Sequence, residues 1–491
     1  MPLLSGLQFP ASPDGSRSST AAGTAVMAQA LRPLSPAAAQ AAQSERHWRR
    51  NYPAHFRALV QGALASSELA LASARAGLAQ ARESLVWAEG GAERPLGDAM
   101  QAPGTFANLR LQGEGDAKPA AWGLPLRGDF LQGQALVEQL GRWQEAGVIE
   151  PSSAAALARC AQHPEWFDLS DRHIALLGAG SEAGPLRWLA RWRANLLAVD
   201  IDRPAVWQRI AGIVREGNAT LSAPLRAGAP ASIDHAGADL LTDTPAIAQW
   251  LLAQERALDL ASLAYLDGER HLRVSLAMDL IVQTVSDARP GCSLAYLATP
   301  TDVFAVPAEA VAMAQQCLQE RDLLSRGLQK GLHLATGDRF FQPQYEQPVN
   351  GYGLSDCLVI EQGPNYALAK RLQQWRALEA RARGLRVSLN VAPSTTTASV
   401  VKNPALAAGF AGADRFGIEV FEPDTTNALM AALWVHDLRA AESKANPAQP
   451  LAHPFELFMD QACHGGLWRS PYLARSALPF AAALGWVRQR F

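Results

Sequence analysis

The stretch that decides the fold runs from His173 to Gly184 and reads HIALLGAGSEAG. A short apolar run ends in Gly178, and two more glycines, Gly180 and Gly184, follow closely. An apolar run of this length, closed by glycine, predicts a buried strand that enters a tight turn. Residues 184–194, GPLRWLARWRA, are typical of a helix, and residues 195–202, NLLAVDID, of a second strand. Together these segments predict a strand–helix–strand unit.

Strands and helices continue to alternate after this unit. We expect strand ends in 238–243 (ADLLTD) and 260–267 (LASLAYLD), helices over 271–288 and 366–384, and strands over 292–299 (CSLAYLAT) and 385–393 (LRVSLNVAP). This alternation favours a parallel sheet covered on both faces by helices. The predicted fold class is therefore α/β, a doubly wound parallel sheet of Rossmann type.

The chain divides into four predicted parts. Residues 1–45, rich in Ala, Ser, Pro and Gly, are expected to be a flexible segment. Residues 46–165 are expected to form a separate helical region, 166–440 the Rossmann-like domain, and 441–491 a C-terminal helical segment. Residues 306–353 interrupt the alternation and are interpreted as a long insertion, which contains an irregular loop of the kind often used as a lid.

Composition narrows the classes of function. The 491 residues carry a net charge of −2, which gives no bulk attraction to nucleic acid or to an anionic membrane. The five cysteines are scattered without a C-x-x-C pair, which fits a reducing compartment. No apolar run reaches membrane-spanning length, and the N-terminus lacks the pattern of a signal peptide. We therefore expect a cytoplasmic protein that acts on a small molecule, with a homo-oligomer possible.

The glycine-rich turn is the strongest chemical signal. A turn of this type, directly after a strand, allows a pyrophosphate to approach backbone N–H groups. Asp200 ends the second strand, where an acid can bind ribose hydroxyls and would repel a 2′-phosphate. NAD is therefore slightly favoured over NADP, although nearby Arg203 weakens that preference. The predicted cofactor contacts in this half of the domain are Gly178, Gly180, Ser181, Glu182, Gly184, Asp200, Arg203 and Asp239.

Three later segments carry hydroxyl groups or an acid/base pair. CSLAYLATPTD delivers Thr299 and Thr301 to the C-terminal edge of the sheet, although T-P-T-D is equally good turn chemistry. EQGPNYALAK places Tyr366 and Lys370 one helical turn apart, where a lysine can lower the pKa of the phenol. The segment VAPSTTT follows the last strand and adds the cofactor-contact candidates Pro393, Ser394, Thr395 and Thr397.

The order of these features resembles the short-chain dehydrogenase/reductase family. By this resemblance Tyr366 is the proton donor or acceptor at the substrate oxygen, and Lys370 lowers its pKa and binds the nicotinamide ribose. Thr299 or Thr301 would orient the substrate oxygen, and the segment beginning at Pro393 would pack on the nicotinamide. The resemblance covers about residues 172–440.

The chain also departs from the pattern of that family. The glycine spacing differs, the N-N-A-G motif after the fourth strand is absent, and the helix Asn of the proton relay has no clear match, with Ser275 or Asp279 as the nearest polar residues. The whole insertion separates Thr301 from Tyr366. Ser355, which stands much closer to Tyr366 in the sequence, therefore competes for the hydroxyl role.

The predicted function is an NAD(P)-dependent oxidoreductase that moves hydride between nicotinamide and a carbonyl or alcohol. One alternative is an S-adenosylmethionine-dependent methyltransferase, because that class shares the strand, the glycine-rich turn and the acid. The other is a nucleotide-binding relative without turnover. His453, Cys463 and His464 lack further ligands at suitable spacing, so no metal site is predicted.

Overall fold

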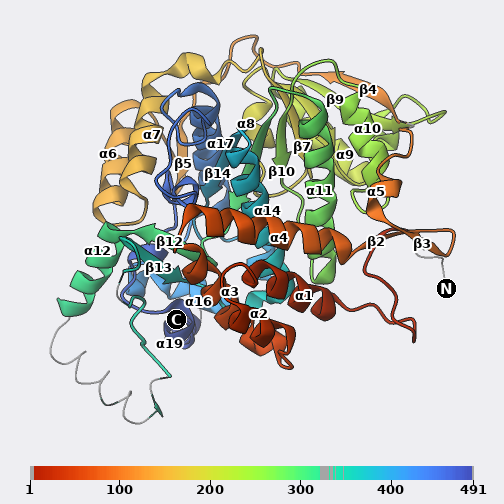
Figure 1. Cartoon of the computed structure of the whole chain (residues 1–491). Coiled ribbons are helices and arrows are strands. Elements are labelled where there is room, and N and C mark those ends of the chain that lie inside the picture. Colours follow the sequence, from red (N-terminus) through yellow and green to blue (C-terminus); the bar gives the residue numbers. More distant parts are fainter. Residues whose placement is uncertain are drawn as a thin grey trace.

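A seven-stranded sheet runs through the centre of the molecule (Figure 1). The computed structural model describes residues 5–104, 106–320, 331, 336–337, 339–346 and 348–488. The strands of the sheet are β4 (Phe106–Gln112), β7 (His173–Leu177), β8 (Asn195–Val199), β9 (Thr220–Arg226), β10 (Asp259–Ser262), β11 (Ser293–Ala298) and β14 (Arg386–Val391). Their spatial order is β14-β11-β10-β7-β8-β9-β4.

Six of these strands are parallel, and only β4 pairs antiparallel, with β9 at one edge. Counted in chain order from β7, the parallel strands lie in the order 3-2-1-4-5-6, which is the order of doubly wound dinucleotide-binding sheets. The predicted α/β class with a mostly parallel central sheet is therefore confirmed. The order reverses between β7 and β10, and ligands of such sheets bind beyond the strand ends at that point.

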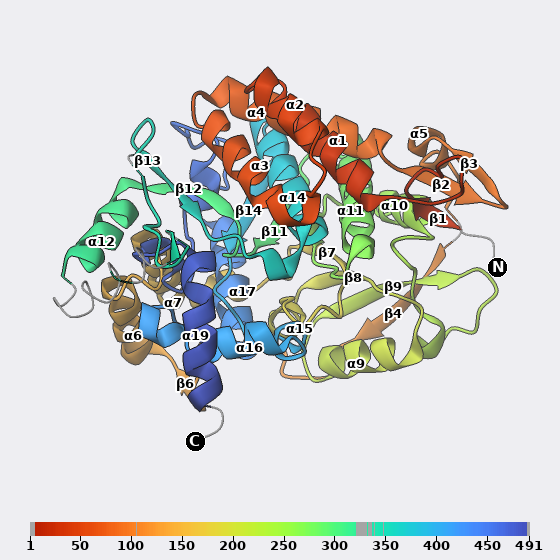
Figure 2. The same ribbon diagram turned by 90° about the horizontal axis from the view of Figure 1, so that it is seen from below.

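Helices cover both faces of the sheet (Figure 2). On one face α10 (Thr244–Leu252), α11 (Glu269–Ala288) and α14 (Pro364–Ala382) share a hydrophobic core with the strands. On the other face α6 (Gly133–Glu145), α7 (Pro151–Gln162), α9 (Pro204–Arg215) and α17 (Pro423–Arg439) do the same. Strands such as β7 and β8 are buried on both faces, which explains their continuous apolar sequences.

The N-terminal region differs from its prediction. Residues 19–43, expected to be flexible, form α1 (Ser19–Leu31) and α2 (Pro36–Gln43), and α1 buries Val26, Met27 and Leu31. Together with α3 (Trp48–Ala63) and α4 (Ser67–Glu83), they pack outside α14 and α11. Their small residues permit close packing, since a Cβ at Gly77 would lie 2.4 Å from the Trp375 ring.

Residues 46–165 do not form a separate helical region. Besides helices they contain β4, which belongs to the central sheet, and short strands outside it. These are β2 (Val86–Glu89) and β3 (Ala92–Arg94), which continue β1 (Gly6–Gln8), and β5 (Leu124–Leu126) paired with β6 (Asp129–Leu131); α5 (Leu96–Ala99) follows β3.

Two predictions within the domain are wrong. The third strand is β9, not the segment 238–243, which forms turns instead. Pro224 inside β9 obscured it. The pairing of β9 with β8 ends at Ser222, so Pro224 lies in the part of β9 that pairs with β4, and its missing N–H breaks no hydrogen bond to β8. The predicted helix over 184–194 is only the single turn α8 (Leu186–Leu189); turns closed by hydrogen bonds between residues three apart follow it, and Arg193 has φ +60°, which is incompatible with a continuing helix.

Two paired strands bracket the segment predicted to be an insertion. β12 (Val303–Pro307) runs antiparallel to β13 (Tyr352–Asp356), and α12 (Ala308–Gln319) follows β12. Residues 321–330 and 332–335 of the segment predicted to be an insertion lie outside the described residues. The remaining helices are α15 (Ala398–Val401), α16 (Pro404–Ala411), α18 (Glu456–Met459) and α19 (Ala474–Arg488). No described helix is both long and apolar enough to cross a membrane.

Candidate active site

The glycine-rich turn lies at the point where the strand order reverses. Gly178 follows β7 with φ +91°, and a Cβ there would stand 2.5 Å from the Ala264 backbone after β10. Its N–H donates to the carbonyl of Val199, the last residue of β8, at 2.9 Å. Only glycine fits this conformation and this close approach. The turn closes with a hydrogen bond of 3.0 Å from the Gly184 N–H to the Ser181 carbonyl.

Asp200 ties the glycine-rich turn to the end of β8. Its carboxylate accepts hydrogen bonds from the N–H groups of Gly180 (2.7 Å) and Ile201 (2.9 Å). Burial raises the pKa of Asp200, against the lowering effect of these two bonds. Each oxygen retains a lone pair, so the carboxylate can still accept a ribose hydroxyl.

The other candidates of this half surround Asp200. Arg209 of α9, which belongs to none of the sequence motifs, donates to the Gly180 carbonyl at 2.6 Å. Arg203 is exposed and precedes the first turn of α9. Asp239 is close enough to help raise the pKa of Asp200, while its own carboxylate accepts the Leu241 N–H at 2.8 Å.

The loop after β14 meets the glycine-rich turn. Pro393 and Ser394 are buried, and the Thr395 hydroxyl donates to the Pro393 carbonyl at 2.9 Å. The Thr397 N–H donates to the Thr395 carbonyl at 2.8 Å, and α15 follows directly. The Glu182 carboxylate accepts the Ala398 N–H at 3.0 Å. The two segments predicted to contact cofactor therefore touch each other.

Four predicted residues, Thr299, Thr301, Tyr366 and Lys370, gather at the C-terminal end of β11. The Tyr366 phenol lies near enough to Thr299 for that hydroxyl to lower its pKa, and the Thr299 hydroxyl lies 2.9 Å from that of Thr301. Lys370 Nζ donates to the Leu297 carbonyl of β11 at 3.1 Å and lies 6.0 Å from the centre of the Tyr366 ring. Tyr366, Lys370 and Thr299 thus come together although the whole insertion separates Thr299 from Tyr366 in the sequence.

The electrostatics of this group differ from the expectation. Burial raises the pKa of Tyr366, and the nearby Thr299 hydroxyl offsets only part of that rise. Burial also lowers the pKa of Lys370 to about 8, against the charge of Asp302. Lys370 directs its Nζ to Leu297 and, at 3.4 Å, to Gln373, so it does not lower the pKa of the phenol here.

Three polar residues considered for this site lie in other contacts. Ser355 sits on β13, where its hydroxyl bonds Gln344 at 2.9 Å rather than Tyr366. Asp279 forms a buried ion pair with Arg376 at 2.6 Å. Ser275 is buried on α11, and its hydroxyl has no hydrogen-bond partner among the described residues.

Sequence reasoning missed two aromatic neighbours of Tyr366. The His271 ring stacks on the Tyr366 ring with centroids 5.3 Å apart and planes at 20°. Tyr265 meets Tyr366 edge-on at 6.1 Å. His271 was hidden at the start of an apolar helix, and Tyr265 stands where the family motif N-N-A-G is missing. The feature that could have identified both residues in the sequence is their position shortly after the fourth parallel strand.

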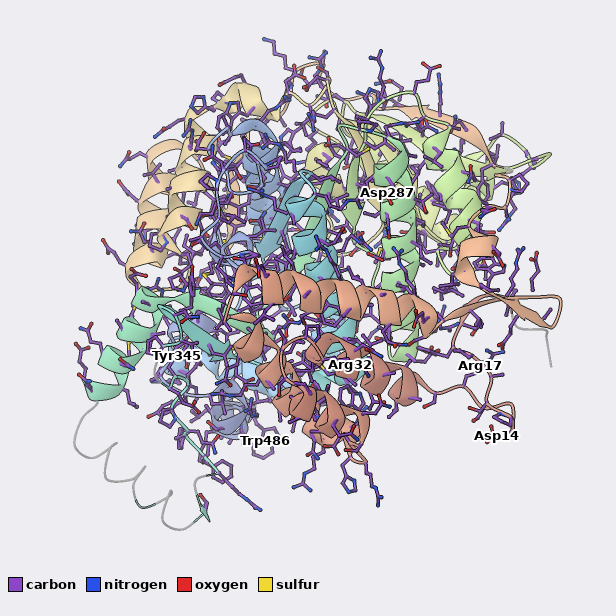
Figure 3. The ribbon with its side chains drawn as sticks, in the orientation of Figure 1. Asp14, Arg17, Arg32, Asp287, Tyr345 and Trp486 are labelled. Atoms are coloured by element: carbon purple, nitrogen blue, oxygen red, sulfur yellow. The ribbon has the colours of Figure 1, made fainter. Side chains whose placement is uncertain are left out.

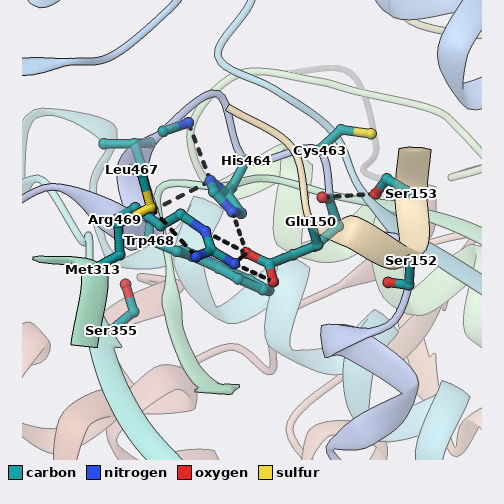
Figure 4. A network of polar contacts seen from close by, with 12 residues as sticks. Glu150, Ser152, Ser153, Met313, Ser355, Cys463, His464, Leu467, Trp468 and Arg469 are labelled. Atoms are coloured by element: carbon teal, nitrogen blue, oxygen red, sulfur yellow. Dashed lines mark hydrogen bonds and ion pairs between the residues drawn. The ribbon is translucent and has the colours of Figure 1, made fainter. Parts of the chain in front are cut away.

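His464, near the C-terminus, belongs to a different network (Figure 4). His464 is buried and lies 2.9 Å from Glu150 through Nε2, while Arg469 contacts both oxygens of that carboxylate. His453 instead contacts the Ala63 carbonyl at 3.2 Å. Burial raises the pKa of Cys463 to about 12, so this thiol is not a nucleophile at neutral pH. Within the described ranges no group of three His, Cys, Asp or Glu side chains is arranged to hold a metal ion.

Comparison with known proteins adds little to this geometry. No family model and no curated protein matches the chain. One similar solved structure is the terminal R domain from the myxalamid PKS-NRPS biosynthetic pathway, with 15% identity and a TM-score of 0.30 over 53% of this chain and 61% of that one. Another is a thiolation-reductase di-domain from an archaeal non-ribosomal peptide synthetase, with 11% identity and a TM-score of 0.27 over 52% of each chain. The chain thus spans 61% and 52% of the two structures, and the fold assignment rests on strand order.

Proposed function

We propose that this chain is an NAD(P)-dependent oxidoreductase of the short-chain dehydrogenase/reductase type, acting on a carbonyl or alcohol. The observation that carries the proposal is the contact of Tyr366 with Thr299, beside Lys370, at the C-terminal edge of a sheet in dinucleotide-binding order. Neither a methyltransferase nor a passive nucleotide-binding protein needs such a group.

The residues present fit a dinucleotide. The turn at Gly178 has no room for a Cβ because the backbone of Ala264, in the loop after β10, packs directly against it, so the ends of β7 and β10 approach closely at the edge where a dinucleotide would bind. Two buried polar atoms on the elements around it, Ser262 Oγ at the end of β10 and His271 Nε2, have no protein partner among the described residues. Asp200 would hold the adenosine ribose, and Lys370 the nicotinamide ribose.

The chain's own residues would divide the chemistry as follows. The nicotinamide, when bound, supplies or accepts the hydride. Thr299 orients the substrate oxygen through its hydroxyl. Tyr366 is a neutral phenol at neutral pH because burial raises its pKa, so it can donate a proton to the oxygen in the reductive direction. The pKa of Lys370 is about 8, so its ammonium group can release a proton near neutral pH and restore the proton that Tyr366 has lost.

Thermal-shift titrations with NADH, NADPH and S-adenosylmethionine test this proposal. We expect one nicotinamide cofactor to raise the melting temperature and S-adenosylmethionine to leave it unchanged. Stabilisation by S-adenosylmethionine alone would refute the proposal. Tyr366→Phe should keep the cofactor-induced shift and lose the oxidation of reduced nicotinamide in a panel of aldehydes and ketones. Ser355→Ala, which removes a hydroxyl bonded elsewhere, is the matched control and should retain activity.

A further inference from the structure

One ring nitrogen of His271 has a hydrogen-bond partner, and the other has none among the described residues. It lies in the first turn of α11 and is 1% exposed. Its Nδ1 accepts the backbone N–H of Leu266 at 3.4 Å, so the ring proton is assigned to Nε2. That Nε2 is buried and has no hydrogen-bond partner among the described residues. His271 therefore presents a neutral N–H donor without an acceptor from the described protein.

An unpaired buried donor requires an explanation, because most buried polar groups are hydrogen-bonded. Two observations connect this donor with the candidate site. The His271 ring is stacked on the Tyr366 ring, and the charge of Lys370 is near enough to act on its pKa. The loop after β10 also joins it to the glycine-rich turn: Ala264 of that loop touches Gly178, and Leu266 of the same loop bonds His271.

His271 remains an uncharged donor over the working pH range. Burial lowers its pKa to about 3, and the neighbouring Lys370 acts in the same direction. The other titratable groups packed around it are Tyr265 in the loop after β10 and Tyr366 on α14, both phenols whose pKa values are raised by burial. An uncharged N–H donor suits an uncharged oxygen, such as a hydroxyl or an amide carbonyl, more than a phosphate.

We propose that His271 is a ligand-binding residue of this site, whose Nε2–H donates to an uncharged oxygen in the nicotinamide nucleoside half of the cofactor. The inference rests on the proposed function. The acceptor is a ribose hydroxyl or the nicotinamide carboxamide oxygen, since both belong to the part of a dinucleotide that would lie beside Tyr366 and Lys370.

Two substitutions separate the donor from the aromatic stack. His271→Phe keeps a ring against Tyr366 and removes the N–H, whereas His271→Gln restores an N–H donor near the position of Nε2 and loses the stack. Because one neutral hydrogen bond is lost, NADH should bind His271→Phe about 2- to 13-fold more weakly, and His271→Gln should recover much of that loss. The matched control is His453→Gln, since that buried histidine already bonds the Ala63 carbonyl.

Binding is measured by thermal shift and by calorimetry with NADH, NADPH and ADP-ribose. If His271→Phe binds both NADH and ADP-ribose more weakly than wild type does, the acceptor is the ribose. If it binds only NADH more weakly, the acceptor is the carboxamide. In protein labelled with ¹⁵N-histidine, the Nε2–H resonance of His271 should shift when NADH is added, whether or not a variant folds poorly. Unchanged NADH affinity in His271→Phe, or an unmoved resonance at saturating NADH, overturns the inference. If wild type binds no nicotinamide cofactor, the proposed function fails instead.

Discussion

Replacing Asp302 by Ala tests the link between the end of β11 and the helix that carries Tyr366. Asp302 is fully buried and bonds Arg371 at 2.8 Å and Gln374 at 2.8 Å, both on α14. Its carboxylate also accepts the Val303 N–H at 2.7 Å. Without it the buried Arg371 charge loses its counter-ion. Breaking a buried pair in this way costs about 3–5 kcal/mol, which is roughly two to four powers of ten in the unfolding equilibrium.

Urea unfolding followed by tryptophan fluorescence measures this effect. The control is Asp287→Ala, because Asp287 on the outside of α11 forms an exposed ion pair with Arg383 and should lose about 0–1 kcal/mol (Figure 3). The double variant Asp302→Ala/Arg371→Met removes both buried charges and should recover most of the loss. The reasoning is refuted if Asp302→Ala is as stable as Asp287→Ala, or if the double variant is less stable than the single one.

The same substitution should also alter the candidate site. The charge of Asp302 holds the pKa of Lys370 up against burial, so its removal should move that pKa below about 8. Less of the ammonium form then remains at pH 8. If Lys370 contributes as proposed, the alkaline limb of the pH–rate profile moves to lower pH in Asp302→Ala, and an unshifted limb would mean that Lys370 does not set it.

Three further outcomes are expected. Gly178→Ala should lose at least about 2 kcal/mol in urea unfolding, because φ is +91° and backbone lies 2.5 Å from the added Cβ, whereas Gly180→Ala should lose less, because only flexible side chains obstruct it. In the unfolded chain Lys370 keeps its ordinary pKa of 10.5, while burial in the folded protein lowers it to about 8. Between these two pH values the unfolded chain binds more protons, so folding becomes more favourable as the pH rises. In urea unfolding, wild type should therefore gain stability relative to Lys370→Met from pH 8 to pH 10. Burial acts to raise the pKa of Glu150, but the bonds and charges of His464 and Arg469 outweigh it and lower that pKa, so Glu150→Gln should cost about 1.5–3 kcal/mol at pH 7, and this deficit should shrink as wild type is titrated below pH 4.5.

The sequence allowed the central sheet to be predicted because its signals are local. The buried strands β7, β8, β10, β11 and β14 are short apolar runs closed by turn residues. The edge pair β4 and β9 gave a weaker signal, since β4 is largely exposed and β9 contains Pro224. The helix α1 depends on partners elsewhere in the chain, since a Cβ at its Gly23 would lie 3.2 Å from Trp48. Without those partners in view, a sequence rich in small residues looks like that of a flexible segment.

The sequence allowed the types of residue in the candidate site to be predicted, but not which of them lie in contact with one another. Spacing identified Tyr366 and Lys370, but it could not choose between Thr299 and Ser355, because that choice depends on the path of the intervening chain. Spacing also suggested that Lys370 lowers the pKa of the phenol. Burial reverses this direction, and burial is a property of the assembled structure. His271 was missed for the same reason, since only tertiary contacts distinguish a ligand-facing histidine from a core one.

The long insertion leaves the site intact because its two ends are bonded to each other. Val303, which follows Asp302, is paired with Asp356, shortly before the helix that carries Tyr366. The backbone of Asp302 accepts the Cys357 N–H at 3.1 Å, while its side chain bonds Arg371 on α14. The chain therefore leaves and returns at one fixed point next to the site. Length added between β12 and β13 therefore does not move Thr299 away from Tyr366.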